Sequence, residues 1–425
     1  MKLPKLLYPG LKIKRWGFLC LAGILIVIAG SWAYWWDFLF KFTPGWQIRI
    51  PIIILGSLII AFGVREMVRS VAGVFIPQRE KELFDIIYTK RHLSKGPRIV
   101  AIGGGTGLPV LLSGLKEYTS NITAVVTVSD DGGSSGRLRK EYGILPPGDI
   151  RNCLVALADT ESLMQDLFQF RFEKGSQLGE HSFGNIFITA MTKITGDFGA
   201  AIKESSKVLA VRGRVIPSTL DRATLVAHHI DGSKTVGEDN LTENSIPIKE
   251  VQILPSDCQP APDVLEALLQ ADAIVFGPGS LYSSILPNLL INSIVDTICQ
   301  SLALKIYVCN VMTEYRETAH YTASEHIKAI IKHTNPDIIQ TVIVNTAHIP
   351  NIILERYKSE RAEMVIPDIE NIRKMGYRVI EEEVINISPY SDIPSLGSIR
   401  HNPDKIARII ISLIKKDKKL KGSYI

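Results

Sequence analysis

Cysteine is scarce in this chain of 425 residues, and the five cysteines form no C-x-x-C pair and no cluster with metal-ligand spacing. They are Cys20, Cys153, Cys258, Cys299 and Cys309. This usage excludes a disulfide scaffold or a zinc module and is typical of buried thiols in a reducing compartment. Internal repeats and low-complexity segments are also absent. The length is enough for a large α/β core with an additional segment.

Acidic residues are few in one part of the chain only. Residues 1–95 hold 14 Lys or Arg against 5 Asp or Glu, whereas residues 96–425 hold 34 against 38. The basic excess therefore belongs to the N-terminal segment. Because the remainder is mildly acidic, a nucleic-acid-binding surface is not expected there.

Charged residues are missing altogether from two apolar stretches near the N-terminus. Residues 16–36 would span about 30 Å as a helix, the thickness of a bilayer core, and end in Trp32, Tyr34, Trp35 and Trp36, an interfacial belt of aromatic residues. Residues 50–64 form a shorter stretch between two arginines. We expect two transmembrane helices in a hairpin over residues 1–70; a hairpin that enters one leaflet without crossing is the alternative.

The positive charges around these stretches predict the topology. Lys and Arg precede the first stretch and follow the second, while the short loop between them has few. Positively charged flanks stay on the cytoplasmic side, so both termini and the bulk of the protein are expected in the cytoplasm. Residues 71–95 read as a basic juxtamembrane linker near anionic headgroups.

From residue 96 to 425, apolar strand-like runs alternate with helical patterns, which favours one α/β domain with a mostly parallel sheet covered by helices on both faces. Expected strands are 98–102, 122–128, 273–276, 305–309 and 341–344. Expected helices are 108–118, 152–171, 184–194, 198–208, 261–270, 286–301, 322–333 and 404–416. Residues 214–254 break the rhythm with turn signals and predict a small antiparallel β insertion.

A glycine-rich turn follows the first expected strand and opens a helix. It consists of Gly103, Gly104, Gly105, Thr106 and Gly107. Glycines let backbone N–H groups approach an anion, and the helix start adds its positive dipole end. There is no lysine for a Walker A loop, and Leu108 replaces the third glycine of a dinucleotide fingerprint. The turn predicts phosphate binding; a tight βα turn without a ligand is the alternative.

The second expected strand is followed by a loop of acidic, small and basic residues, in which Asp130, Asp131, Ser134, Ser135 and Arg137 are candidate ligand contacts. An acid at a strand end often binds ribose hydroxyls; it could instead hold a metal or act as a base. Serine and arginine suit a phosphate. The alternative is an Asp-Gly turn with solvated charges.

Two later loops carry further polar candidates, namely Asp149, Arg151 and Asn152, then His181, Ser182 and Asn185. Helix capping accounts for one residue in the first loop, and Ser182 is a plausible N-cap in the second. His181 could exchange a proton or donate to phosphate. No orienting carboxylate and no nucleophile elbow accompany it, so we assign no catalytic residue and no metal ligand.

A second glycine turn follows the strand at 273–276. Gly277, Gly279 and Ser280 would supply donors, and Tyr282 could stack on a ring; Asn310 follows the next strand. Since carboxyl ends of parallel strands share one edge, two such loops predict a ligand with two parts, for example a base with ribose and a diphosphate-linked sugar.

The motifs GGGTGLPVLLSGL, TVSDDGGSSGRLR, LPPGDIRNCLVAL, HSFGN, VRGRVIPST, GPGSLYSSILPNLL and MTEYRETAHYTASEH resemble the YvcK/CofD-like, or gluconeogenesis factor, family over residues 96–415. The resemblance implies a Rossmann-like fold and two branches. One contains cytosolic regulators that bind UDP-sugars and affect cell shape, peptidoglycan precursor supply and gluconeogenic growth. The other contains 2-phospho-L-lactate transferases, in which the first loop and the aspartate at Asp130 or Asp131 serve the substrates. The membrane hairpin is an addition, and Tyr315-Arg316 replaces the Pro-Gly usual after Met-Thr.

The resemblance is nearer to the first branch, so the expected function is a membrane-tethered, cytoplasm-facing regulator that binds a nucleotide sugar of the UDP-GlcNAc type. Its expected partners are that ligand, the membrane, a second copy of itself and an unidentified protein. The alternative is a transferase with a nucleotide-diphosphate donor, in which Asp130 or Asp131 binds Mg²⁺ or activates the acceptor. A pyridine-nucleotide oxidoreductase is disfavoured because Leu108 breaks the fingerprint.

Overall fold

The computed structural model describes residues 13–40, 46–75, 91–160, 162–176, 178–241, 246–359, 361–386 and 399–422. The chain divides into two compact units, Met1–Arg91 and His92–Ile425, and each is described by itself. Much of the linker expected at 71–95 lies outside the described residues.

The first unit is a pair of long helices that lie side by side, α1 (Ile13–Phe40) and α2 (Trp46–Phe75). Glycines permit close packing between them. A Cβ atom at Gly23 would lie 2.7 Å from Cγ1 of Ile60, and one at Gly56 would lie 2.7 Å from Cγ2 of Val27. Small residues of this kind let two helix backbones approach closely.

Among the described helices, one stretch is long and apolar enough to cross a membrane by length and composition, Ile50–Met67 in α2. It contains the expected second span and extends three residues further. The apolar stretch identified in α1, Arg15–Ser31, is shorter. The side chains of the expected aromatic belt at residues 32–36 lie outside the described ones.

The second unit is built on a seven-stranded parallel sheet with the order β10-β9-β8-β7-β1-β2-β3. Its strands are β1 (Ile99–Gly103), β2 (Ile122–Val126), β3 (Arg214–Pro217), β7 (Ala273–Phe276), β8 (Leu304–Val308), β9 (Thr341–Asn345) and β10 (Arg378–Glu382). The chain builds outward from β1 in one direction and from β7 in the other. The order therefore reverses between β1 and β7, as in doubly wound folds that bind ligands at the reversal.

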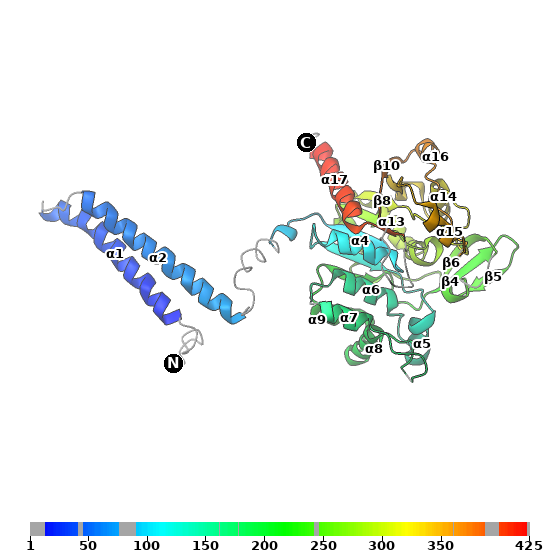
Figure 1. Ribbon diagram of the computed structural model, residues 1–425, viewed down its shortest axis with the longest axis horizontal. Helices are drawn as coiled ribbons and strands as arrows, with labels where there is room; N and C mark the ends of the chain where they lie inside the picture. The colour runs from blue at the N-terminus through cyan, green and yellow to red at the C-terminus, as the bar shows by residue number, and fades with distance from the viewer. Residues whose placement is uncertain are drawn as a thin grey trace. The chain divides into compact units, whose positions relative to one another are not determined.

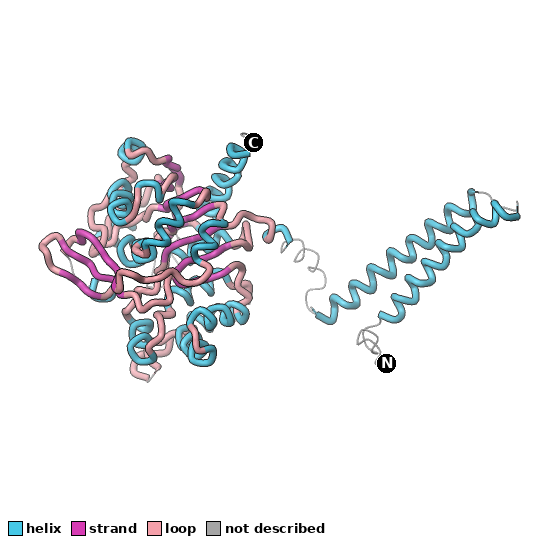
Figure 2. The backbone as a smooth tube through the Cα atoms, turned by 180° about the vertical axis from the view of Figure 1, so that it is seen from behind, coloured by secondary structure: helices cyan, strands magenta, loops and turns pink. Residues whose placement is uncertain are grey.

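Helices cover both faces of this sheet (Figures 1 and 2). One face packs against α4 (Gly107–Leu115), α6 (Gly148–Leu157), α8 (Phe183–Thr195), α9 (Phe198–Val208) and α17 (Pro403–Gly422). The other packs against α11 (Val264–Gln270), α12 (Leu286–Leu289), α13 (Asn292–Gln300), α14 (Ala323–His333) and α16 (Ile369–Lys374). Successive strand residues alternate between the two cores: Ile99 faces the first and Val100 the second. The expected fold class is thereby confirmed for this unit.

Outside the sheet and the insertion, the described elements also include three α-helices, two short helical turns and two short strands. They are α5 (Gly133–Tyr142), α7 (Ser162–Gln169), a π-helical turn (Leu281–Ile285), a 3₁₀ turn (Pro336–Ile338), α15 (Asn351–Ser359), β11 (Ile385–Asn386) and β12 (Arg400–His401). β11 and β12 pair antiparallel.

The β insertion is smaller than expected. It consists of β4 (Thr224–His229), β5 (Lys234–Val236) and β6 (Ile248–Leu254), in the antiparallel order β5-β4-β6, with α10 (Glu238–Leu241) between β5 and β6. Its expected start at residue 214 is wrong, because β3 pairs parallel with β2 in the main sheet.

Several expected boundaries also differ from those of the structure. The helix expected at 152–171 is two helices, α6 and α7, and the one expected at 286–301 is α12 followed by α13. Residues 133–142, interpreted as a loop because small and polar residues dominate them, form α5. The edge strand β10 was not expected, and β3 was expected only as part of the antiparallel insertion.

The packing of α17 on α4 generates a prediction. A Cβ atom at Gly114 would overlap the carbonyl oxygen of Pro403. We therefore expect Gly114→Ala to lower the free energy of unfolding by about 2 kcal/mol, since backbone cannot give way as a side chain would. Thermal unfolding followed by circular dichroism measures the loss. Gly199→Ala on α9, where the nearest atom would be the Asp197 carboxylate at 3.2 Å, is the matched control; an equal loss in both variants contradicts the prediction.

Candidate functional site

The two glycine loops meet at the point where the strand order reverses. A Cβ atom at Gly107, at the end of the first loop, would overlap the carbonyl oxygen of Pro278 in the second. The Asn310 side chain, which follows β8, holds the second loop: its Oδ1 accepts from Gly279 N at 2.9 Å and its Nδ2 donates to Gly279 O at 2.8 Å. The expected convergence of β1, β7 and β8 on one edge is therefore present.

The first glycine loop is tied to the start of α6 by Asp149. Gly105 has a φ of +61° and donates its N–H to Asp149 Oδ2 at 2.7 Å. A Cβ atom at Gly104 would lie 2.6 Å from the same oxygen. Burial raises the pKa of Asp149 to about 6, and nearby Asp130 adds to the rise. One of the loop amides expected to bind phosphate is thus already bound to a carboxylate.

Residues after β2 reach the same edge through α5. Ser135 Oγ accepts from Gly148 N at 3.2 Å, so α5 touches the start of α6. Asp130 accepts from Gly132 N at 3.0 Å, and burial raises the pKa of its carboxyl. Ser134 and Ser135 are buried within α5 rather than displayed on a loop.

A buried network links α5 with α6 and α8. Ser134 Oγ lies 2.9 Å from Nδ1 of His181 and accepts from Asn185 Nδ2 at 3.0 Å. Burial lowers the pKa of His181, which favours the neutral form of the imidazole. The expected N-cap is confirmed: Ser182 Oγ accepts from Asn185 N.

Arg151 completes this network from within α6. Its guanidinium donates to Ser182 Oγ and, at 2.7 Å, to Asn152 Oδ1. Burial lowers its pKa to about 10. Asp149 makes no capping bond to α6, which begins at Gly148 with Pro147 as N-cap. The capping reading of Asp149 and Asn152 is therefore wrong; both lie inside the helix.

Asp131 and Arg137 point to neighbouring segments. Asp131 Oδ1 accepts from Asp239 N at 2.9 Å and so holds the end of the β insertion. Arg137 donates to Gly179 O at 2.9 Å and lies 3.6 Å from the Glu180 carboxylate. The expected contacts of Asp131 and Arg137 with a ligand remain predictions. A ligand would have to replace the bonds that these side chains make to Asp239, Gly179 and Glu180.

Two acids that follow β8 accept hydrogen bonds from the second glycine loop and the turn after it. Glu317 Oε2 accepts from Tyr282 N at 2.8 Å and Ser283 N at 3.3 Å, and Glu314 accepts from Ser280 Oγ at 3.0 Å. Burial raises the pKa of both carboxyls, that of Glu314 to about 8. The stacking role of Tyr282 is wrong: its side chain is buried in the core and its hydroxyl lies 3.0 Å from that of Tyr321.

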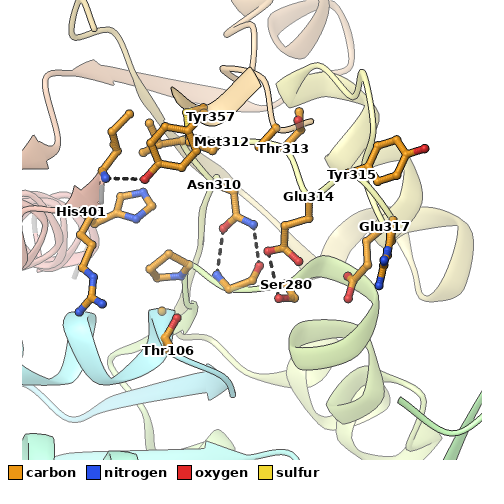
Figure 3. Close-up of a pocket in the computed structure, with 18 of the residues that line it drawn as sticks. Thr106, Ser280, Asn310, Met312, Thr313, Glu314, Tyr315, Glu317, Tyr357 and His401 are labelled. Atoms are coloured by element: carbon orange, nitrogen blue, oxygen red, sulfur yellow. Dashed lines mark hydrogen bonds between the residues drawn. The ribbon is translucent and has the colours of Figure 1, made fainter. Parts of the chain in front are cut away.

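A pocket of about 790 Å³ opens between the first glycine loop and the segments after β7 and β8 (Figure 3). Thr106, Gly107, Gly279, Ser280 and Asn310 of the predicted set line it. The residues that line it include none of the other predicted residues. In the described part of the chain, α4 has no side-chain cap on its N-terminus at Thr106 and Gly107.

The pocket also contains residues that sequence reasoning did not single out. Arg316 and Arg400 are exposed on its lining, and neither side chain hydrogen-bonds or pairs with an acid among the described residues. His401 Nε2 donates to Cys309 O at 3.2 Å, which leaves Nδ1 as an acceptor; burial lowers its pKa to about 4. No local signal marks Arg400 and His401, because β12 reaches the pocket from far along the chain.

The acids of this edge do not form a preformed metal site. Within the described ranges, no group of three or more His, Cys, Asp or Glu side chains is arranged to hold a metal ion. Asp130 and Asp131, the expected Mg²⁺ ligands of the transferase alternative, accept from the backbone of Gly132 and Asp239 instead. We derive no step through a metal here.

The family model described as 2-phospho-L-lactate transferase CofD matches residues 99–385. The chain belongs to the CofD family. A Gluconeogenesis factor from Bacillus subtilis is 47% identical over 324 residues, which is 76% of this chain and all of that protein. A relative from Nostoc sp. is 44% identical over 428 residues, 96% of this chain and 91% of the relative. These relatives show that it is a gluconeogenesis-factor member of the family.

Solved structures agree with this fold. A crystal structure of a UPF0052 family member from Bacillus halodurans matches with a TM-score of 0.71 and 45% identity, over 75% of this chain and 99% of that one. The Bacillus relatives therefore consist of the α/β part alone, whereas the Nostoc relative matches over nearly the full chain.

The raised pKa of Asp149 generates a pH prediction. Its carboxyl titrates near 3.8 when exposed and at about 6 when folded, so its ionisation opposes folding as pH rises through 6. We expect Asp149→Asn, which keeps an acceptor for Gly105 N, to be more stable than the parent at pH 8 by about 2 kcal/mol. The difference should vanish near pH 4.

Denaturation midpoints measured from pH 4 to pH 8 test whether Asp149→Asn becomes more stable than the parent as the pH rises. Asp166→Asn on the exposed face of α7 is the matched control and should show no comparable pH-dependent gain. A variant at Asp149 that is less stable than the parent at every pH contradicts the account.

Proposed function

We propose that this protein is a membrane-tethered, cytoplasm-facing regulator that binds a nucleotide sugar of the UDP-GlcNAc type and adjusts envelope-precursor metabolism and cell shape. One observation carries the ligand class: the large pocket lies at the strand reversal, where doubly wound sheets bind nucleotides. Its size falls within the range of small-molecule sites.

The charges of the pocket support an anionic ligand. Arg316 and Arg400 offer guanidinium groups with no partner among the described side chains, and α4 directs an uncapped N-terminus at Thr106 toward the same space. Guanidinium groups and helix N-termini both favour phosphate oxygens. Because burial raises the pKa of Glu314 to about 8, this acid is largely neutral at pH 7 and does not repel a diphosphate.

A sugar or a base would occupy the rest of the pocket. Tyr357, Met312 and Val311 line the side away from the glycine loops, and the Tyr357 hydroxyl accepts from Ile399 N at 2.7 Å. Neutral His401 and protonated Glu314 provide an acceptor and a donor for hydroxyl or amide groups. This mixture suits a ligand with a charged middle and polar, uncharged ends.

The helical hairpin supports the membrane tether. Its outward side chains are large and apolar: Phe18, Leu21, Leu25, Leu55 and Leu58 are each more than half exposed. Such a surface is costly in water and matches lipid. We propose that both helices cross the bilayer, with the termini and the α/β unit in the cytoplasm.

A binding role fits the site better than catalysis. Ser134 and His181 form a hydroxyl–imidazole pair, but among the described residues no carboxylate hydrogen-bonds the imidazole to orient it. A triad needs that third group. The transferase alternative rests on the name of the family model and on the raised pKa of Asp149, a potential base. Ligand binding would instead change the loops seen by a protein partner or a second copy.

Binding of UDP-sugars tests the proposal directly. We expect calorimetry of the detergent-solubilised chain to detect UDP-GlcNAc, and Arg316→Gln combined with Arg400→Gln to weaken binding about 10- to 100-fold by removing charge-assisted hydrogen bonds. Arg378→Gln on the exposed edge strand β10 should bind as the parent does.

Absence of heat and of thermal shift with UDP-GlcNAc, UDP-glucose and UDP contradicts the ligand proposal. Turnover of the bound nucleotide sugar in the presence of acceptors, lost in Asp149→Asn while binding persists, would favour the transferase alternative.

Membrane insertion is a separate prediction. We expect the full chain to stay in the membrane pellet after alkaline carbonate extraction, because carbonate strips peripheral proteins but leaves buried hairpins. A chain that begins at residue 92 should be released under the same treatment. Release of both chains contradicts the tether.

A further inference from the structure

The amino edge of the parallel sheet, opposite the ligand pocket, carries a second surface. Helix α17 packs through Ile406, Ile410 and Ile414 on the core beneath α4. Beyond Ile414 the helix continues with exposed lysines and leaves the body of the unit (Figure 1). They are Lys415, Lys416, Lys418 and Lys419, with Asp417 between them.

Two contacts place this basic end at the amino edge. Lys418 Nζ lies 2.9 Å from Asp272 Oδ1, and Asp272 precedes β7. Asp272 Oδ2 in turn accepts from the backbone N–H of Arg98, which precedes β1, at 2.7 Å. The basic end of α17 therefore lies beside the residues that precede β1 and β7.

Further basic side chains belong to the same edge. Lys95, Arg98 and Arg214 are exposed, and Arg98 and Arg214 line a smaller pocket of about 350 Å³ at the starts of β1, β2 and β3. Asp272 is already paired with Lys418. The edge is therefore strongly basic in a unit whose overall balance is acidic.

Large apolar side chains are exposed among these charges. Leu302, just before β8, is 88% exposed, Leu420 on α17 is 60% exposed, and Leu269 near the end of α11 is 56% exposed. Basic residues interspersed with exposed leucines are the chemistry of proteins that lie on anionic lipid, with the cations at the headgroups and the leucines at the acyl boundary. Phosphates of a nucleic acid would offer these leucines no apolar surface.

We propose that this edge, defined by the lysines at the end of α17, Lys95, Arg98, Arg214, Leu302 and Leu420, docks on the anionic lipid surface of the membrane. In the cell the docking rests on the proposed tether, which holds the edge near the bilayer and raises its effective concentration there. Docking at the amino edge leaves the pocket at the carboxyl edge open to cytoplasmic ligands.

Vesicle partition tests the docking without the hairpin. The Bacillus relatives consist of the α/β part alone, so residues 92–425 are a suitable folded unit. We expect this unit to sediment with vesicles of phosphatidylcholine mixed with phosphatidylglycerol but not with phosphatidylcholine alone. Added salt should release it, because screening weakens exposed charges.

Two variants separate the charges from the leucines. Lys415→Gln, Lys416→Gln and Lys419→Gln together spare the Lys418–Asp272 pair and should lower partition at least about tenfold; Leu302→Ser should lower it by a smaller factor. Lys203→Gln, Lys328→Gln and Lys374→Gln, at exposed positions elsewhere, form the matched control and should partition as the parent does.

Equal partition on neutral and anionic vesicles, or equal partition of the triple variant and its control, overturns the proposal. So does retention on DNA that exceeds retention on anionic vesicles. Calorimetry with UDP-GlcNAc on the same triple variant measures binding at the pocket on the carboxyl edge. The affinity should equal that of the parent. Failure of docking and failure of the ligand proposal are therefore told apart.

Discussion

The carboxyl edge of this protein depends on one steric constraint, the close contact between its two glycine loops. The first loop follows β1 and the second follows β7, and they touch where no Cβ atom would fit, at Gly107 against Pro278. Strand order reverses at this point, so the chain leaves β1 and β7 in opposite directions and opens a crevice above them. Asn310 locks the second loop from the neighbouring strand end.

Buried acids hold this arrangement in place, and burial raises the pKa of these carboxyls toward neutral pH. Asp149 binds the first loop and Glu317 the second, each through backbone N–H groups. Glu238 lies near both Asp149 and Glu317, and burial raises its pKa to about 8. Carboxyls of this kind satisfy loop amides that would otherwise be unpaired, yet those with raised pKa carry less negative charge at pH 7 than their number implies. The guanidinium groups of Arg316 and Arg400 then dominate the open part of the pocket.

The two edges of the sheet differ in chemistry. The carboxyl edge is concave, hydrogen-bonded and rich in glycine and serine, which suits a small ligand held by many short contacts. The amino edge is basic and partly apolar at α17 and Leu302, which suits an extended surface. The two surfaces lie at opposite ends of the parallel strands and are separated by the length of those strands, so each can be occupied while the other is free.

The sequence by itself determined what depends on neighbours along the chain. The apolar runs of β1, β2, β7, β8 and β9, the glycine turns after β1 and β7 and the apolar helices near the N-terminus are all local patterns, and the motifs identified the family.

Only the tertiary structure decided which side chains meet. The short edge strand β3, with a proline at its end, carries no pattern of its own and is a strand because β2 pairs with it. Tyr282 follows a glycine turn but is drawn into the core, Glu317 takes the amides expected for a phosphate, and Arg400 and His401 reach the pocket from a distant segment. Contacts between residues far apart in sequence form only when the sheet and its helices pack, and no local pattern encodes them.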